Sequence, residues 1–250
     1  MGAGLLDGKT VLVTGASRGI GRAVALACAE SGADVAGLAR TESALDELGA
    51  EVRDAGASFL AVPTDLHDLG AVASAVDRAW AWKPLDALIN AAGIMVRSQS
   101  LEITPEQWDE VFAVNVRASF FLCQAVGRKM LEGGGGSITN IASVAAEVAT
   151  GASVVYSASK GAIVQMSRVL AVRWAPKIRV NAVGPAYIRT DLNSEWLDEP
   201  DNAKFVTDRT PLGRVGSVSD VVGPTLFLTS DGAAYVTGQH LLVDGGWAAQ

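Results

Sequence analysis

Short apolar segments alternate along the whole chain with longer segments in which apolar residues recur at helical spacing. This alternation is typical of repeated β-α-β units, which build a parallel sheet that helices bury on both faces. The pattern predicts a doubly wound α/β fold with one seven-stranded parallel sheet. The expected strands are Thr10–Thr14, Asp34–Leu38, Ser58–Val62, Ala87–Asn90, Ser137–Ile141, Arg179–Val183 and His240–Val243.

The size and composition of the chain suit one globular unit. Its 250 residues are 49% hydrophobic and 19% charged, a balance that allows a substantial buried core. We therefore expect a single domain over residues 1–250. The net charge of -7 disfavours nucleic acid and anionic membranes as partners, because both require clustered Lys and Arg.

Targeting, disulfide and metal signals are weak in this sequence. Residues 1–8 lack the basic and apolar regions of a signal peptide, and no apolar run approaches the length of a membrane span, so we expect a cytoplasmic protein. Cys28 and Cys123 fall within expected helices without a partnering spacing and are interpreted as small buried hydrophobes. His67 and His240 lack ligand-like spacing, so no metal site is expected.

The segment Glu106–Leu131 is the best-marked helix of the sequence. Thr104 precedes it as an N-cap, Pro105 falls in its first turn, and Gln107 completes a capping box. Gly19–Ser31 has the same helical periodicity. Both segments are therefore expected to cross between parallel strands.

Two polar residues interrupt the apolar stripe of the longer helix. Asn115 and Ser119 fall on the stripe that runs in steps of three and four residues through Trp108, Val111, Phe112, Leu122 and Val126. Ser119 permits close helix packing, whereas Asn115 would carry four hydrogen-bonding sites into the interior. Asn115 is thus a candidate functional residue, with a satisfied structural amide as the alternative.

Gly15, Gly19 and Gly21 follow the first expected strand and open a helix. A backbone without Cβ can approach a pyrophosphate closely, and a helix N-terminus offers unpaired N–H groups and partial positive charge. Glycine turns between a strand and a helix also occur for purely conformational reasons. The pattern therefore indicates a dinucleotide site only in combination with other motifs.

Tyr156 and Lys160 stand four residues apart, so both side chains leave one face of an expected helix. An ammonium group beside the phenol should stabilise phenolate and lower the tyrosine pKa toward the working range. Tyr156 would then serve as a general acid or base. The alternative is an amphipathic tyrosine and a snorkelling lysine on a partly solvated face.

Taken together, these motifs resemble the short-chain dehydrogenase/reductase family over essentially the whole chain. The glycine signature Thr14–Gly21 and the motif Asn90–Gly93 after the fourth strand both match. The resemblance implies a Rossmann-like enzyme, usually a homotetramer, that uses NAD(P)(H) to interconvert a secondary alcohol and a ketone. The four positions of the family's catalytic set are filled by Asn115, Ser143, Tyr156 and Lys160.

The resemblance assigns a role to each member of this set. It makes Tyr156 the acid/base, and Ser143 orients and polarises the carbonyl or alcohol. Lys160 lowers the tyrosine pKa and holds the nicotinamide ribose, while Asn115 positions a proton-relay water. The residues that it implies at the cofactor are Gly15, Ser17, Arg18, Gly19, Ile20, Gly21, Arg40, Asp65, Leu66, Asn90, Ala91, Gly93, Tyr156, Lys160, Pro185, Ile188 and Thr190.

Three segments depart from the family pattern. The usual Pro-Gly after the sixth strand appears as Gly184-Pro185-Ala186, which leaves the details of the cofactor contact open. Arg173 stands where an acidic residue is common, and the turn at Lys177-Ile178 is one residue short. None of the three belongs to the catalytic set, so we expect effects on packing or on a subunit contact.

The end of the second expected strand bears on the choice of cofactor. An acidic residue there would bind both ribose hydroxyls and repel a 2′-phosphate. This chain has Leu38-Ala39-Arg40 instead, and Arg18 in the glycine loop can approach the same region. Two guanidinium groups would attract a phosphate, so NADP(H) is favoured. NAD(H) stays the alternative, with Arg40 as a strand cap and Arg18 in solvent.

The substrate is the least constrained part of the prediction. Residues 191–209, which include Trp196, are expected to form a lid over the site. Arg97 can pair with a substrate carboxylate, although a solvated loop arginine fits its position equally well. The candidate substrate contacts are Arg97, Ser143, Tyr156 and Trp196.

Resemblance narrows the substrate class. The stretch from Gly213–Gly216 through Val243–Trp247, with the segment from Val96-Arg97 through Trp108, looks most like the gluconate and 2-deoxygluconate dehydrogenases of the family. A sugar acid is therefore the leading class. A 3-oxoacyl thioester, as in the 3-oxoacyl-carrier-protein reductases, is the alternative. A dinucleotide-binding sensor or scaffold without turnover is the alternative outside enzymes.

Overall fold

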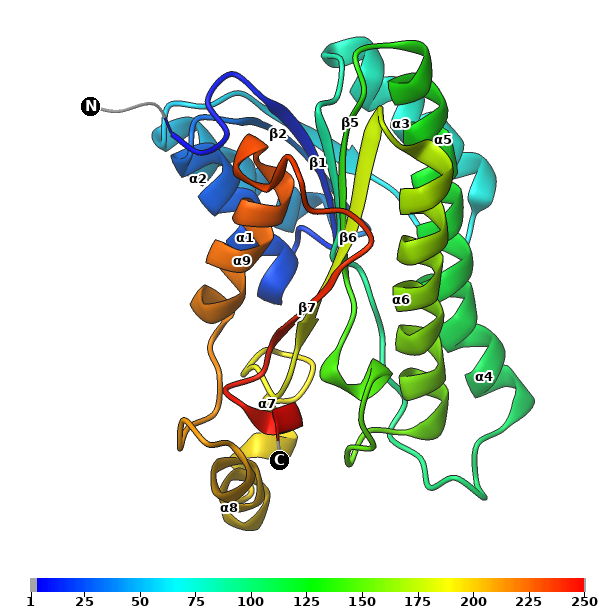
Figure 1. The fold of residues 1–250 in the computed structure, drawn as a ribbon, viewed down its shortest axis with the longest axis vertical. Helices are drawn as coiled ribbons and strands as arrows, with labels where there is room; N and C mark the ends of the chain where they lie inside the picture. Colours follow the sequence, from blue (N-terminus) through cyan, green and yellow to red (C-terminus); the bar gives the residue numbers. More distant parts are fainter. Residues whose placement is uncertain (1–3, 250) are drawn as a thin grey trace.

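The computed structural model describes residues 4–249 and is built around one sheet (Figure 1). Its strands are β1 (Thr10–Thr14), β2 (Asp34–Ala39), β3 (Phe59–Pro63), β4 (Ala87–Asn90), β5 (Gly136–Ile141), β6 (Ile178–Pro185) and β7 (His240–Val243). They lie in the order β3-β2-β1-β4-β5-β6-β7, and each neighbouring pair is parallel. The predicted doubly wound α/β fold is confirmed.

The helices are α1 (Gly19–Glu30), α2 (Glu42–Asp54), α3 (Leu69–Trp82), α4 (Pro105–Phe112), α5 (Ser119–Glu132), α6 (Val154–Trp174), α7 (Ser194–Asp198), α8 (Pro200–Arg209) and α9 (Val218–Thr229). Figure 1 shows α1, α2 and α9 on one face of the sheet and α3, α5 and α6 on the other. Adjacent residues of β1 point to opposite faces. Val13 packs in the cluster that contains Val24 of α1, and Leu12 in the cluster that contains Leu122 of α5. The sheet is thus buried on both sides.

The strand boundaries differ slightly from the expected ones. β6 extends to Pro185, two residues beyond the expected end, because Pro185 still pairs with Val243 of β7. Proline can occupy this position since it closes the strand and needs to supply only its carbonyl group. The extension places Gly184 and Pro185 at the carboxyl end of β6, and Ala186 follows directly.

The helix expected over Glu106–Leu131 is not one regular α-helix. α4 begins with the predicted capping box: the Gln107 N–H donates to Thr104 Oγ1 at 3.3 Å, and the Thr104 N–H donates to Gln107 Oε1 at 3.2 Å. A π-helical segment, Ala113–Ala118, then separates α4 from α5. Its wider turn changes the phase of the helical face, and Trp108 is 41% exposed instead of belonging to a buried stripe.

The strand order reverses between β1 and β4, which creates a crevice at their carboxyl ends. The turns after these two strands touch there, because a Cβ placed on Gly15 would lie 2.8 Å from Cα of Ala92. Gly15 also has a φ of 68°, a left-handed conformation that favours glycine. Open α/β sheets bind ligands at such a point, so this edge is where a site is expected.

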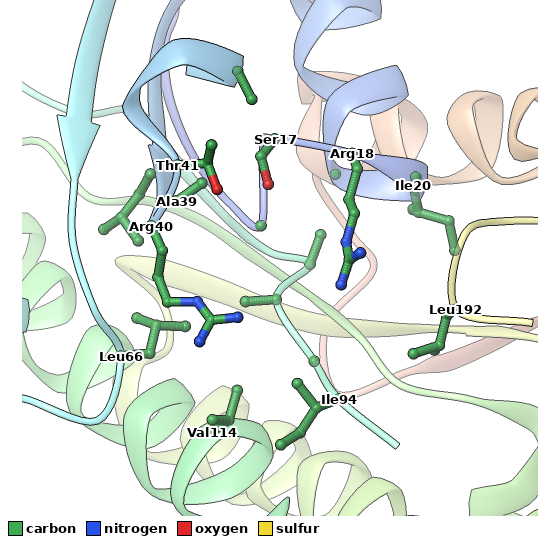
Figure 2. Close-up of a pocket in the computed structure, with 18 of the residues that line it drawn as sticks. Ser17, Arg18, Ile20, Ala39, Arg40, Thr41, Leu66, Ile94, Val114 and Leu192 are labelled. Atoms are coloured by element: carbon green, nitrogen blue, oxygen red, sulfur yellow. The ribbon is translucent and has the colours of Figure 1, made fainter. Parts of the chain in front are cut away.

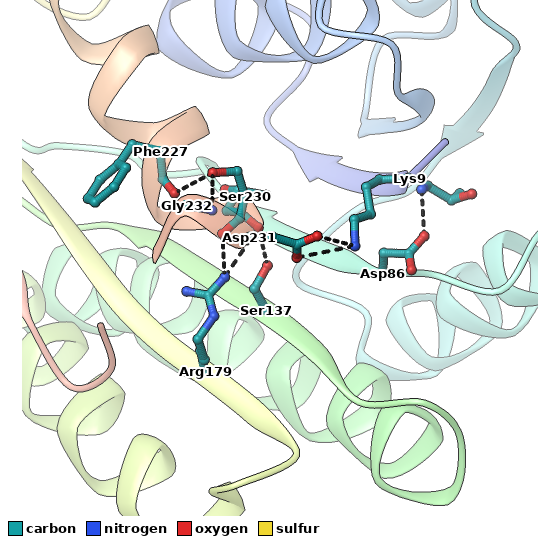
Figure 3. A network of polar contacts seen from close by, with 10 residues as sticks. Lys9, Asp86, Ser137, Arg179, Phe227, Ser230, Asp231 and Gly232 are labelled. Carbon is teal, nitrogen blue, oxygen red and sulfur yellow. Dashed lines mark hydrogen bonds and ion pairs between the residues drawn. The ribbon is translucent and has the colours of Figure 1, made fainter. Parts of the chain in front are cut away.

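Polar contacts at the amino-terminal end of β6 hold the end of α9 (Figure 3). Arg179 of β6 donates from Nη1 to the carbonyl of Leu228 at 2.8 Å and from Nη2 to the carbonyl of Ser230 at 2.9 Å. Ser137 of β5 donates from Oγ to the carbonyl of Thr229 at 2.8 Å. The last carbonyl groups of a helix have no partner inside the helix, so these donors fix α9 to the sheet.

Within residues 4–249, no helix combines the length and the apolar character needed to cross a bilayer. Residues 1–3, which belong to the segment without signal-peptide features, and residue 250 lie outside the described part of the chain.

Candidate active site

Two adjoining cavities lie along the carboxyl ends of the strands. The larger has a volume of about 430 Å³ and extends from the glycine loop after β1 to the segment after β3. The smaller has a volume of about 150 Å³ and lies between the start of α6 and residues 190–196. They form one continuous cleft because several residues line both. The shared residues are Ile20, Ala91, Gly93, Thr190 and Leu192.

The cleft brings together most of the residues predicted for the site. Those that line the larger cavity are Gly15, Ser17, Arg18, Gly19, Ile20, Gly21, Arg40, Asp65, Leu66, Ala91, Gly93 and Thr190. Those that line the smaller cavity are Ile20, Ala91, Gly93, Arg97, Ser143, Tyr156, Lys160, Pro185, Ile188, Thr190 and Trp196. Asn90 and Asn115 lie behind these walls, in contacts described below.

The glycine loop leaves room for a ligand backbone at the start of α1. Gly19 has a φ of 55°, and Arg18 precedes it as an extended N-cap without a side-chain capping bond. A Cβ on Gly21 would collide with the carbonyl oxygen of Gly15, so the loop and helix pack too closely for a side chain. The first N–H groups of α1 are therefore available to an anion.

Arg18 and Arg40 extend into the larger cavity from two different loops (Figure 2). Both residues are exposed, and neither forms an ion pair with a carboxylate within residues 4–249. The end of β2 has no acidic residue, since Ala39 is followed by Arg40 and Thr41. The cavity thus presents two cationic groups in the region expected to decide between a ribose hydroxyl and a phosphate.

A histidine bridges the rim of the larger cavity. His67 Nδ1 lies 2.8 Å from Asp65 Oδ1, and His67 Nε2 lies 3.0 Å from Glu110 Oε2 on α4. The hydrogen bond with Asp65 raises the pKa of His67, and the charge of Glu110 adds to this effect. The main-chain N–H of His67 in turn holds the pKa of Asp65 below its ordinary value. His67 therefore ties α4 to the segment after β3.

Ser143 is oriented by the turn that it opens. It is the N-cap of a short 3-10 turn, η2 (Val144–Ala146), and its Oγ accepts a hydrogen bond from the Ala145 N–H at 3.1 Å. The same hydroxyl donates to the carbonyl of Pro185 at 3.4 Å, which links it to the end of β6. Ser143 is 7% exposed and lies in the wall of the smaller cavity.

Tyr156 and Lys160 leave one face of α6, as their spacing predicted. The Lys160 Nζ donates a hydrogen bond to the carbonyl of Ile141 at 2.8 Å and lies 5.6 Å from the centroid of the Tyr156 ring. Burial lowers the pKa of Lys160 to about 8. Burial also raises the pKa of Tyr156, and a hydrogen bond with Ser143 opposes this rise. The expected lowering of the tyrosine pKa is therefore wrong for this structure, because desolvation dominates.

Asn115, in the π-helical segment, is 1% exposed and has partners within the protein. Its Oδ1 accepts from the Ile94 N–H at 2.8 Å, and its Nδ2 donates to the Ile94 carbonyl at 2.9 Å and to Ser159 Oγ at 3.0 Å. Ser159, which no sequence motif marks, donates to the carbonyl of Tyr156 at 2.7 Å. Asn115 thus fixes the turn after β4 against α6.

Asn90 turns its side chain into the interior. Its Nδ2 donates to Asn140 Oδ1 at 2.9 Å, and Asn140 Nδ2 donates to Ser167 Oγ at 2.8 Å. This chain of hydrogen bonds connects β4, β5 and α6, so the side chain of Asn90 is engaged in the interior. Cys123 lies beside Asn90 Nδ2, and burial raises the pKa of its thiol to about 12, consistent with a structural cysteine.

An aromatic cluster supports the segment expected to act as a lid. Trp196 of α7 stacks on Tyr187 with ring centroids 5.6 Å apart, and Tyr187 packs on Trp247 at 4.9 Å. The Arg97 guanidinium lies 5.5 Å from the Trp196 ring centre, and its Nη2 donates to the Leu192 carbonyl at 3.4 Å. Tyr187 directly follows the segment Gly184-Pro185-Ala186, and no signal in the sequence marks it as part of the site.

Known proteins resemble this chain over almost its entire length. A family model described as enoyl-(acyl carrier protein) reductase matches residues 15–248. The 2-dehydro-3-deoxy-D-gluconate 5-dehydrogenase of Dickeya dadantii is 37% identical, over 98% of this chain and 97% of that protein. The D-threitol dehydrogenase of Mycolicibacterium smegmatis is also 37% identical, over 97% of this chain and 94% of that protein.

A solved structure agrees with this chain in fold as well as in sequence. The crystal structure of a gluconate 5-dehydrogenase from Burkholderia cenocepacia, in complex with NADP and tartrate, has a TM-score of 0.94 and 35% identity over 98% of this chain and 97% of that one. The chain belongs to the short-chain dehydrogenase/reductase family and is an oxidoreductase that acts on CH–OH groups with NAD(P) as acceptor.

Proposed function

We propose that this protein uses NADP(H) to interconvert a secondary alcohol group of a sugar acid and the corresponding ketone. The observation that carries the proposal is the continuity of the cleft. A glycine-lined cavity with two guanidinium groups joins a second cavity that contains Ser143, Tyr156 and Lys160, with Arg97 beside them. The relatives named for gluconate-type substrates support the sugar-acid class.

The residues of the larger cavity fit a dinucleotide. The close approach at Gly15 and the free N–H groups at the start of α1 suit a pyrophosphate. Arg18 and Arg40 suit a 2′-phosphate, because guanidinium groups form charge-assisted hydrogen bonds with phosphate oxygens. NADP(H) is therefore proposed over NAD(H). Ile188 and Thr190, in the wall of the smaller cavity, would hold the carboxamide end.

The residues of the smaller cavity would transfer the proton and orient the reacting group of the substrate. When bound, the nicotinamide supplies the hydride acceptor for oxidation and the hydride donor for reduction. Deprotonated Tyr156 takes the proton of the substrate hydroxyl during oxidation, and protonated Tyr156 returns it to the carbonyl oxygen during reduction. When substrate is bound, the Ser143 hydroxyl turns from the Pro185 carbonyl and donates its one hydrogen bond to that same oxygen, on which charge develops. Lys160, buried in the same wall, would hold the nicotinamide ribose.

Arg97 and the lid segment supply the proposed substrate recognition. Within residues 4–249, no carboxylate is paired with Arg97, and the Trp196 ring holds its guanidinium beside the smaller cavity. A guanidinium group in this state suits the carboxylate end of a sugar acid. A 3-oxoacyl thioester stays the second candidate substrate, because the matching family model is described by an enzyme that also acts on acyl groups of acyl carrier protein, although that enzyme reduces a C=C bond.

The test is a cofactor absorbance assay with NADP(H) and NAD(H) in parallel. The panel contains D-gluconate, 2-deoxy-D-gluconate, their keto forms and a 3-oxoacyl thioester. Selective turnover of the sugar acids with NADP(H) is the expected result. Preference for the thioester would replace the proposed substrate class, and preference for NAD(H) would replace the proposed cofactor.

Tyr156→Phe separates an enzyme from a dinucleotide-binding sensor. The variant keeps the ring but loses the proton carrier, so turnover should fall by roughly 10²- to 10⁴-fold while NADPH binding is retained. Unchanged turnover in Tyr156→Phe would refute the mechanism. Tight NADPH binding by the wild-type protein without turnover across the panel would favour the sensor.

Assembly into a homotetramer, usual in the family, is part of the proposal. Phe120 and Phe121 of α5 and Val172 of α6 are exposed apolar residues that an interface of this kind would cover. Light scattering coupled to size exclusion should give four times the chain mass, and a monomer would contradict the assembly.

A further inference from the structure

We propose that His240, at the start of β7, is a positioning residue for Ser143. The inference rests on the proposed role of Ser143 at the substrate oxygen. The His240 side chain is 2% exposed and contacts two segments that orient the serine, η2 on one side and the end of β6 on the other. It lines neither cavity, so it acts through its neighbours.

The first contact anchors the far end of η2. Ser143 is the N-cap of this turn and Glu147 is its C-cap. His240 Nδ1 lies 2.8 Å from Glu147 Oε1, and because a carboxylate only accepts, Nδ1 is the donor. This hydrogen bond holds the pKa of Glu147 below its ordinary value, which keeps the acceptor ionised. Arg168 of α6 also reaches Glu147 Oε1, at 3.3 Å from a more exposed position.

The second contact fixes the end of β6. The imidazole lies directly against Gly184, where a Cβ would collide with His240 Nε2. Gly184 precedes Pro185, whose carbonyl accepts the hydrogen bond from Ser143 Oγ. The His240 side chain therefore supports both segments that place Ser143 Oγ: the turn that Ser143 caps, and the end of β6, whose Pro185 carbonyl accepts the serine proton when no substrate is bound.

The remaining ring nitrogen argues against a purely structural role. His240 Nε2 is buried and has no hydrogen-bond partner among the described residues. Burying an unpartnered imidazole nitrogen is unfavourable, so an apolar residue would suit simple packing better at this position of the strand. The hydrogen bond from Nδ1 to Glu147 is what an apolar residue could not supply.

The test compares His240→Val, His240→Asn and Arg168→Met in kcat and KM for the most active substrate of the panel and in NADPH Kd. Valine suits a strand but removes the donor, whereas asparagine keeps an N–H close to the Nδ1 position. Arg168→Met is the matched control, because it removes the more exposed partner of the same carboxylate. We expect kcat to fall roughly tenfold in His240→Val with NADPH Kd unchanged, and to stay within about threefold of wild type in the other two variants.

A second variant guards against a folding defect. Glu147→Ala removes the acceptor from the exposed side and should reproduce the loss of kcat in a protein with a wild-type melting temperature. Wild-type kcat in both His240→Val and Glu147→Ala would overturn the inference, and so would equal losses in His240→Asn and His240→Val.

Ser143→Ala, measured in parallel, separates this inference from the proposed function. Loss of turnover in Ser143→Ala with normal kcat in His240→Val would overturn the role of His240 alone. Normal turnover in Ser143→Ala would overturn both.

Discussion

The Nζ of Lys160 lies 5.6 Å from the centroid of the Tyr156 ring, while its hydrogen bond goes to the carbonyl of Ile141. Two ionisable side chains thus share one desolvated wall without a direct hydrogen bond between them. Burial favours the neutral form of each, since it lowers the pKa of Lys160 to about 8 and raises the pKa of Tyr156. Such opposed pairs of ionisable groups are common at functional sites.

Lys160→Met should stabilise the fold at neutral pH while it impairs turnover. The folded-state pKa of Lys160, about 8, lies below its ordinary value of 10.5, so the buried charge costs stability below pH 8. That cost disappears as the pH rises from about 8 to 10.5. Allowing for the lost hydrogen bond to Ile141, the variant should gain on the order of 1 to 2 kcal/mol in free energy of unfolding at pH 7.

Urea unfolding at pH 7 and pH 10 measures this effect. The advantage of Lys160→Met over wild type should shrink at the higher pH. Lys204→Met, at an exposed lysine of α8, is the control and should show no such change. An advantage of equal size at both pH values would contradict the assignment of the cost to the buried charge.

Arg40→Asp should weaken NADP(H) binding selectively. Replacing a charge-assisted donor to a phosphate by a carboxylate should raise the Kd of NADPH about 10- to 100-fold and change that of NADH far less. Fluorescence titration of both cofactors provides the comparison. Arg78→Asp, an exposed residue of α3, makes the same charge change away from the cavity and should alter neither value. Equal losses for NADPH and NADH in Arg40→Asp would refute the phosphate contact.

Gly15→Ala and Gly8→Ala form a matched pair for the glycine loop. Their φ angles are 68° and 70°, so alanine pays a similar conformational cost of about 1 kcal/mol at each position. A Cβ on Gly15 would also lie 2.8 Å from Ala92, whereas no atom lies within 4 Å of one on Gly8. Gly15→Ala should therefore lose at least about 2 kcal/mol more stability and bind NADPH weakly.

Calorimetry and NADPH titration test this pair. Similar melting temperatures and similar NADPH affinities for the two variants would show that the close approach of the turns after β1 and β4 contributes nothing beyond backbone strain.

Arg179→Met should destabilise the protein with little effect on the mechanism. The guanidinium group donates to the carbonyls at the end of α9, and methionine would leave them without these donors at a cost of about 2 to 3 kcal/mol. Urea unfolding at fixed protein concentration measures the loss, with Arg128→Met at an exposed position of α5 as control. Wild-type stability in Arg179→Met would mean that water replaces the donors without cost.

Features that depend on only a few neighbouring residues could be predicted from the sequence. The capping box of Thr104 and Gln107, the glycine turn after β1 and the shared face of Tyr156 and Lys160 each depend on backbone geometry over one or two turns. The alternation of apolar strands with amphipathic helices likewise leads to the doubly wound sheet, because only helices on both faces can bury such strands.

Other features depend on segments that only the tertiary structure brings together. Lys160 finds its acceptor on Ile141, Asn115 bonds to the turn at Ile94, and the π-helical turn around Asn115 accompanies that contact. His240 reaches Glu147, 93 positions earlier in the chain. Hydrogen-bond partners and desolvation follow from strand register and packing between distant segments. The sequence by itself therefore determined which groups the site contains, and only the folded chain decided their partners and their pKa values, because both depend on what surrounds each group in space.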